Sequence, residues 1–165
     1  MKVLVSACLL GENCKYNGGN NYSEAVSDFV KDKEVIAICP EMLAGMGCPR
    51  TPIEIVDGIL MDRHGNNVDG AMRDAVAKAL AQLHGQEIAC AILQSRSPTC
   101  GVNQVYDGSF SGKLIPGSGI FAKALREAGI PVMDREDLET AVSNFVAISP
   151  VDSGNENVIP LKQPN

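Results

Sequence analysis

The sequence predicts an α/β protein with a mostly parallel sheet, arranged in three layers as in Rossmann-like folds, with helices on both faces. Three observations lead to this prediction. Short apolar runs rich in β-branched residues alternate along the chain with segments whose apolar residues recur at helical spacing. The apolar runs are short and continuous, as buried strands are. The chain has 165 residues, a normal size for one domain.

The elements follow in order along the chain. In the first predicted helix, 22–32, Ser23 is a candidate N-cap. In the second predicted helix, 69–85, Asp69 is a candidate N-cap and Gly85 stands at the end. Gly129 ends the third predicted helix, 117–129. The segment 58–70 is predicted to form a short hairpin or loop. The predicted strands are 2–7, 34–39, 87–93 and 130–134, and the predicted helices are 22–32, 69–85, 117–129 and 135–146.

Composition sets the domain organisation and excludes some partners. We expect one domain over 1–148 and a flexible tail over 149–165, which is rich in Pro, Asn and Ser. A net charge of −6 argues against binding of a nucleic-acid polymer, which needs a basic face. No apolar run approaches the roughly 20 residues that cross a membrane. The N-terminal segment reads as a strand and not as a signal peptide, so we expect a cytoplasmic protein.

Three cysteines follow three of the predicted strands. Cys8, Cys39 and Cys100 each stand where an apolar run gives way to a turn. Ligands of open parallel sheets bind outside the carboxyl ends of the strands. Residues far apart in the sequence are therefore expected to meet at one edge of the sheet.

The six cysteines of the chain allow two interpretations. Cysteine is often a core residue, and we assign that role to Cys90, which lies inside a strand. Thiolates gathered in one crevice instead favour a metal centre that offsets their repulsion. The C-x₂-C pairs of a zinc ribbon are absent, whereas three thiolates could hold an iron–sulfur cluster with one open iron. Cys14 and Cys48 are each a candidate fourth ligand or an exposed thiol.

A glycine turn before the third predicted helix is a weak candidate for substrate binding. A helix that opens on glycines presents backbone N–H groups to an anion, here near Ser118 and Gly119. Lys113 lies close by in the sequence. A plain strand-to-helix turn explains the same pattern.

Several sequence blocks together resemble the thiouracil desulfidase family. The blocks are "VSACLLGENCKYNGG", "ICPEMLAG", "CPRTP", "SRSPTCG" and "YDGSFSGKLIPGSG", in that order over residues 2–134. The resemblance implies a [4Fe–4S] cluster held by Cys8, Cys39 and Cys100, with the fourth iron open. It also implies catalytic roles for Glu41 and Ser97. The family usually reads "GGLPTPR" where this chain reads "AGMGCPR", so Cys48 is an addition.

The resemblance implies removal of sulfur from a thiolated nucleobase, nucleoside or nucleotide without net redox change. The open iron would act as a Lewis acid toward the thiocarbonyl sulfur, and Glu41 would activate water. Such a cluster is expected to be lost in air. Two alternatives stay open: a cluster or sulfur carrier or redox sensor that performs no catalysis, and a zinc-binding domain.

Overall fold

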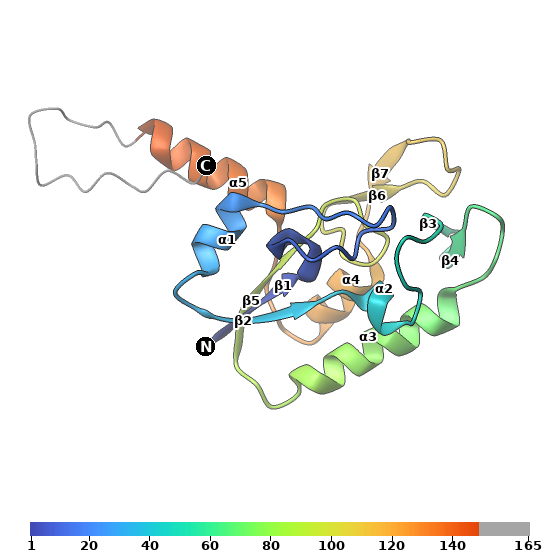
Figure 1. The fold of residues 1–165 in the computed structure, drawn as a ribbon, viewed down its shortest axis with the longest axis horizontal. Coiled ribbons are helices and arrows are strands. Elements are labelled where there is room, and N and C mark those ends of the chain that lie inside the picture. The colour runs from blue at the N-terminus through green and yellow to red at the C-terminus, as the bar shows by residue number, and fades with distance from the viewer. Residues whose placement is uncertain (149–165) are drawn as a thin grey trace, which may run out of the picture.

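The computed structural model describes residues 1–148 and has the predicted mixed α/β architecture (Figure 1). Its main sheet is parallel throughout, with the strand order β2-β1-β5-β8. The strands are β1 (Lys2–Ser6), β2 (Glu34–Ile38), β5 (Ile88–Leu93) and β8 (Val132–Asp134). All four predicted strands are therefore confirmed. The predicted tail, 149–165, lies outside the described residues.

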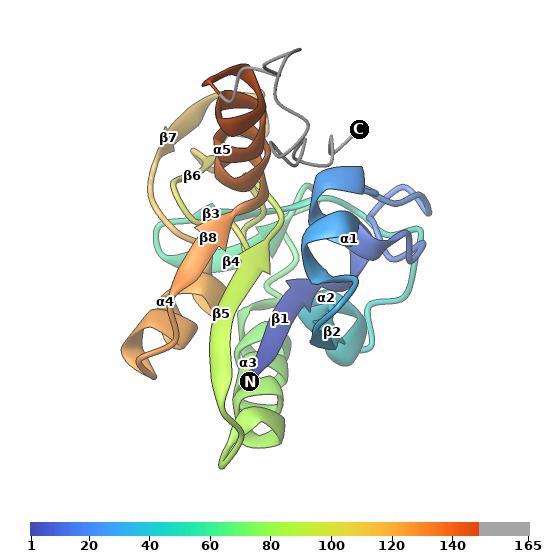
Figure 2. The ribbon, with the colours of Figure 1, turned by 90° about the vertical axis from the view of Figure 1, so that its left-hand side faces the viewer.

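Helices flank this sheet in two groups (Figure 2). The helices α1 (Glu24–Val30) and α5 (Arg135–Ile148) contact each other, as do α3 (Asp69–Leu83) and α4 (Ile120–Glu127). The first group shares a hydrophobic cluster with β1 and β5, and the second group shares a larger one with the same strands. No helix within residues 1–148 has both the length and the apolar character needed to cross a membrane.

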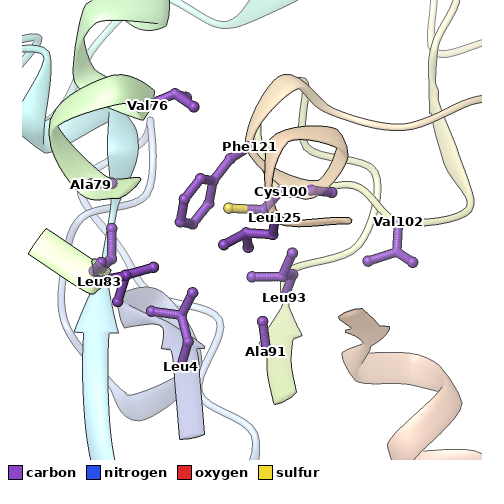
Figure 3. Close-up of a cluster of buried hydrophobic side chains, with 12 residues drawn as sticks. Leu4, Val76, Ala79, Leu83, Ala91, Leu93, Cys100, Val102, Phe121 and Leu125 are labelled. Carbon is purple, nitrogen blue, oxygen red and sulfur yellow. The ribbon is translucent and has the colours of Figure 1, made fainter. Parts of the chain in front are cut away.

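The strands supply alternate residues to the two clusters. Val3 and Val5 face the cluster of α1 and α5, whereas Leu4 faces that of α3 and α4. Successive side chains of a strand point to opposite faces of the sheet, so a continuous apolar run buries both faces. Figure 3 shows the larger cluster, in which Phe121 of α4 lies beside Leu125 and shares the cluster with Leu4 and Leu93 of the sheet.

The strand order places a topological switch point in the middle of the sheet. From β1 the chain goes to β2 on one side, and later to β5 and β8 on the other side. The direction of winding reverses between β1 and β5, which end at Ser6 and Leu93. Ligand sites of parallel α/β sheets lie outside the carboxyl ends of the strands at such a point.

The helix termini confirm one predicted cap and correct another. Ser23 caps α1, because its hydroxyl accepts a hydrogen bond from the Val26 N–H at 3.3 Å. Asp69 is not the cap of α3, whose N-cap is Val68. Asp69 lies inside the helix, and its carboxylate accepts from the Leu60 N–H at 3.1 Å and from Arg73 at 2.8 Å. It therefore ties the helix to a strand.

Several short elements were not predicted. β3 (Ile53–Val56) and β4 (Ile59–Asp62) form an antiparallel hairpin. The predicted hairpin or loop 58–70 contains β4 and folds back on it through an antiparallel bridge between Met61 and Asn67. A second hairpin pairs β6 (Gln104–Tyr106) with β7 (Leu114–Pro116). The 3₁₀ helix η1 (Ala7–Leu10) and the one-turn helix α2 (Pro40–Leu43) directly follow β1 and β2. These elements have three or four residues, which is too short for hydrophobic periodicity to reveal them; β8 is as short, but it lies in the apolar run 130–134.

Candidate functional site

A cavity of about 510 Å³ lies at the carboxyl ends of β1, β2 and β5. Cys8 reaches it from η1, and Cys39 reaches it as the N-cap of α2. Cys100 reaches it from the loop that follows β5. Glu41 and Ser97 line the same cavity. The structure thus brings together the five residues that the sequence predicted as ligands or catalytic groups.

Burial dominates the electrostatics of these thiols. Loss of hydration raises the pKa of Cys8 and raises the pKa of Cys100 to about 12. The proximity of Cys39 and Glu41 raises both pKa values further, because nearby negative charge disfavours a thiolate. Cys100 also belongs to the larger hydrophobic cluster, where it lies near Phe121 and Leu125 (Figure 3). Without a compensating positive centre, these thiols remain protonated at neutral pH.

The donor set suits a thiophilic cluster better than one small ion. Within residues 1–148, no three Cys, His, Asp or Glu side chains are arranged to hold a single metal ion. An iron–sulfur cluster is larger, and each of its cysteine ligands binds a different iron. Two side chains also direct hydrogen bonds at the sulfurs: Asn21 Nδ2 lies 3.5 Å from Cys8 Sγ, and Thr99 Oγ1 lies 3.8 Å from Cys100 Sγ.

The other cysteines occupy three different surroundings. Cys14 is buried and lines the cavity, and burial together with the nearby Cys39 raises its pKa. Cys48 does not line the cavity, and its thiol donates to the Asn13 carbonyl at 2.8 Å. Cys90 packs against the cluster of α1 and α5, in agreement with its predicted core position. Of the two candidates for a fourth ligand, only Cys14 faces the site.

The loop that carries Cys100 is fastened to the N-terminus of α4. The N–H groups of Gly119, Ile120 and Phe121 donate to the carbonyls of Gly101, Pro98 and Thr99, at 2.7, 3.0 and 2.9 Å. The loop crosses the helix so closely that a Cβ on Gly119 would lie 2.3 Å from the Thr99 carbonyl group. Only glycine fits at this crossing.

This contact corrects the interpretation of the glycine turn. The N–H of Gly119 is bound to the loop, so it is not available to an anion. The hydroxyl of Ser118 donates to the Val102 carbonyl at 3.0 Å and accepts from Arg126. Neither residue lines the cavity, and Lys113 does not line it either. A phosphate-binding turn and a loop anchor both need glycine at a helix N-terminus, which is why the sequence did not separate them.

Glu41 forms an ion pair with Arg50, a residue that the sequence analysis did not single out. Only 7% of the Arg50 side chain and 16% of the Glu41 side chain are exposed. Arg50 donates from Nη2 to Glu41 Oε2, and from Nη1 to the Gly47 carbonyl at 2.9 Å. The ion pair engages Oε2 and leaves Oε1 of the same carboxylate for another proton donor. The sequence signal was the "CPRTP" block, which contributed to the resemblance but received no role.

The Ser97 hydroxyl shapes the loop around Cys100. Its oxygen accepts from the backbone N–H groups of Thr99 at 3.1 Å and Cys100 at 3.0 Å. It also lies 2.8 Å from Thr99 Oγ1. A serine that bonds to the backbone of its own turn in this way competes with regular secondary structure, and here it shapes the loop that follows β5. Ser97 therefore has a local structural role in addition to its place on the cavity wall.

Basic side chains dominate the charge of the cavity wall, although the whole chain carries −6. Among the described residues, two carboxylates, Glu41 and Glu54, share the wall with them. No motif indicated this charge, because the basic residues come from separate segments that meet only in the fold. They are Lys15, Arg50, Arg63, Arg96 and Arg135.

Comparison with known proteins identifies the family. The family model described as 2-thiouracil desulfurase matches residues 3–137. The chain belongs to this family. The match confirms the resemblance read from the sequence blocks, and it includes every residue placed at the cavity in the preceding paragraphs. Members of the 2-thiouracil desulfurase family are enzymes, so the prediction of an enzyme is confirmed as well.

Two relatives of this 2-thiouracil desulfurase family member extend the comparison. The chain is 36% identical over 146 residues to the uncharacterized protein YbbK of Bacillus subtilis (strain 168), a match that covers 82% of this chain and 97% of YbbK. A solved structure of the [4Fe-4S]-dependent thiouracil desulfidase TudS is similar, with a TM-score of 0.76 and 31% sequence identity. That match covers 87% of this chain and 98% of TudS.

Proposed function

We propose that this protein removes sulfur from a thiolated nucleobase, or from its nucleoside or nucleotide, by iron–sulfur-dependent hydrolysis without net redox change. The observation that carries the proposal is the meeting of Cys8, Cys39 and Cys100 with Glu41 in one cavity. Membership of the 2-thiouracil desulfurase family and likeness to a [4Fe-4S]-dependent desulfidase support it. Cys8, Cys39 and Cys100 would hold a [4Fe–4S] cluster and leave one iron open.

The chain's own residues supply the acid–base part of the reaction. When bound, the cluster provides a thiophilic Lewis acid for the thiocarbonyl sulfur. Glu41 accepts the proton of the attacking water through Oε1, since Arg50 engages Oε2. Arg50 also keeps the carboxylate oriented toward the cavity that both residues line. The oxygen of water replaces sulfur on the ring carbon, and sulfur leaves as sulfide.

The charge of the cavity supports a substrate that carries negative charge. Arg50, Arg96 and Arg135 are each paired with a glutamate. The preference for an anionic form such as a nucleotide over a neutral base therefore rests on Lys15 and Arg63, the other two basic side chains of the wall. A ligand of this size fits a cavity of about 510 Å³.

We also propose the finer assignments of fold and location. Two helix groups with separate hydrophobic clusters on a four-stranded parallel sheet support a three-layer, Rossmann-like arrangement. All six cysteines are free, which supports a reducing compartment such as the cytoplasm.

Anaerobic reconstitution with iron and sulfide tests the proposal. We expect a brown protein with about four irons per chain that converts 2-thiouracil or a thiolated nucleotide to the oxo form and releases sulfide. Cys8→Ala should lose cluster and activity together, whereas the matched control Cys90→Ala should keep both. A protein with a full cluster that desulfurises no thiolated base would overturn the proposal.

A non-catalytic cluster carrier is the second candidate, and Cys14 is the observation that favours it. Cys14 is the fourth thiol of the cavity wall, and four thiolates would leave no iron open for a substrate. An intact cluster that passes to an apo-protein acceptor, together with the absence of turnover, would identify a carrier. Turnover that survives Cys14→Ala would instead support the enzyme.

A further inference from the structure

The tip of the second hairpin forms part of the cavity wall. Residues 107–113 connect β6 to β7, and we call this segment the strap. Phe110 and Gly112 of the strap line the cavity, as does Tyr106 at the end of β6. Nothing in the ligand set or in the proposed acid–base chemistry uses these residues.

A buried carboxylate fastens the strap. Glu54 of β3 is only 8% exposed, and it lines the same cavity. Its Oε1 accepts hydrogen bonds from the backbone N–H groups of Gly108 at 3.0 Å and Phe110 at 3.1 Å. Burial of a carboxylate is unfavourable unless hydrogen bonds compensate it, and these two bonds are directed at the strap. Glu54 therefore fixes the position of the strap against the cavity.

The backbone of the strap is held in unusual conformations. Phe110 has a φ of +58°, which is rare for a residue with a side chain and costs on the order of 1–3 kcal/mol. Gly108 has a φ of +93°, and a Cβ there would lie 2.6 Å from the Ile55 carbonyl oxygen. Strain of this kind persists only where the surrounding structure enforces it, and it is concentrated at functional sites. Here the strained residue is the one that places an aromatic ring at the cavity.

Aromatic residues are scarce in this chain and concentrated at the cavity. The chain has three Tyr, four Phe and no Trp. Six of these aromatic side chains are described by the structure, and three of the six, Tyr16, Tyr106 and Phe110, line the cavity. Two of the three belong to the β6–β7 hairpin. Flat aromatic rings are the side chains that bind a planar heterocycle by stacking.

We propose that Phe110 is a substrate-binding residue whose ring packs against the planar ring of the thiolated base. Glu54 is a positioning residue that acts through the strap. The inference rests on the proposed function, since that function supplies the planar ligand. Base–aromatic stacking is worth about 1–3 kcal/mol, which corresponds to a change in affinity of about 5- to 150-fold.

The ring is tested by Phe110→Ala in the cluster-loaded protein. Alanine also carries a Cβ, so the backbone strain at this position is unchanged. We expect KM for 2-thiouracil, and the Kd for its product uracil measured by calorimetry, to rise about 5- to 150-fold. The turnover number and the iron content should stay near those of the wild type. Phe110→Tyr should restore affinity, and Ile115→Ala, an exposed change on the same hairpin, should have no effect.

The positioning role is tested at Glu54. Glu54→Gln keeps an oxygen that accepts both strap N–H groups, so its KM should stay near that of the wild type. Glu54→Ala removes the acceptor and should raise KM by nearly as much as Phe110→Ala. The double variant Glu54→Ala/Phe110→Ala should add little to either single change, because both act through one ring.

The outcomes separate this inference from the function on which it rests. Normal wild-type turnover with unchanged KM and uracil affinity in Phe110→Ala would overturn the inference alone. A strongly weakened Glu54→Gln variant would overturn the positioning role. A cluster-loaded wild-type protein that desulfurises neither 2-thiouracil nor a thiolated nucleoside or nucleotide would overturn the proposed function, and with it the ligand assigned to Phe110.

Discussion

Two parts of the cavity wall are held in different ways. The first, which we call the loop wall, is residues 97–101, with Ser97 and Cys100. Backbone hydrogen bonds from α4 and the Ser97 hydroxyl fasten it, and Gly119 allows the close crossing. The second, which we call the carboxylate wall, consists of Cys39, α2 and Arg50. Side chains fasten it, through the Glu41–Arg50 ion pair and the bond from Arg50 to Gly47.

The difference suggests that the loop wall supports the site and that the carboxylate wall performs its acid–base chemistry. Backbone contacts fix the loop wall whatever the protonation state of its side chains, so it suits a cysteine that must be in place before a cluster arrives. The carboxylate wall presents a charged group whose orientation depends on one partner. We expect changes in the loop wall to alter stability and cluster retention, and changes of the Glu41–Arg50 pair in the carboxylate wall to alter turnover.

The largest expected effect is in the carboxylate wall. Glu41→Gln keeps the size of the side chain and can still accept a hydrogen bond from Arg50, but it cannot take a proton from water. Loss of general-base assistance should lower turnover about 10²- to 10⁴-fold while the iron content stays unchanged. Sulfide release by the anaerobically reconstituted protein measures the turnover. Glu127→Gln, a change of an exposed residue, is the control. Wild-type turnover in Glu41→Gln would contradict the proposed role of Glu41 as the general base.

The next effect should come from the crossing in the loop wall. Gly119→Ala places a methyl group against the Thr99 carbonyl, where 2.3 Å is available. Overpacking should lower the free energy of unfolding by about 1–3 kcal/mol or more, and iron retention should fall. Urea denaturation and iron analysis measure the two effects. Gly70→Ala, in helix α3 with open space around its Cβ, should leave stability unchanged or raise it by up to about 1 kcal/mol. Equal behaviour of the two variants would contradict a rigid loop wall.

The burial of Cys100 predicts a dependence of stability on pH in the cluster-free protein. Its pKa is about 12 in the folded chain and 9.0 in the ordinary exposed state. The unfolded chain therefore releases the proton first, so the contribution to stability is complete below pH 9 and is lost as pH rises toward 12. Urea denaturation between pH 8 and 10.5 should show a decline that approaches about 1.4 kcal/mol per pH unit. The stability of a Cys100→Ala variant should decline less steeply as pH rises. Equal slopes for the variant and the wild type would show that burial does not raise the pKa of Cys100.

The smallest effect should follow from Ser97→Ala. Two backbone N–H groups, those of Thr99 and Cys100, lose their acceptor, so stability should fall by about 1 kcal/mol. Turnover should fall less than in Glu41→Gln, because the side chain holds the loop and takes no proton from water. Ser97→Thr should restore stability, since it keeps the hydroxyl. A turnover loss in Ser97→Ala as large as that of Glu41→Gln would place chemistry in the loop wall.

The sequence predicted the sheet and the meeting of the cysteines because both depend on local patterns. Continuous apolar runs marked β1, β2, β5 and β8, and parallel strands carry the residues that follow them to one edge. The pairing of Glu41 with Arg50, and of Glu54 with the strap, depends on segments that meet only in the fold. Asp69 was read as a cap because an acidic residue at a helix start is compatible with a cap and with the first turn.

The attachment of the loop wall to α4 has a consequence for the exchange of backbone amides. The N–H groups of Gly119, Ile120 and Phe121 would be open to solvent at the end of an isolated helix, but here they are closed by the loop. Their hydrogen exchange therefore measures the opening of the loop that carries Cys100, and not the fraying of the helix. Deuterium uptake at the start of α4 thus reports how often this loop opens, even in protein from which every iron has been removed.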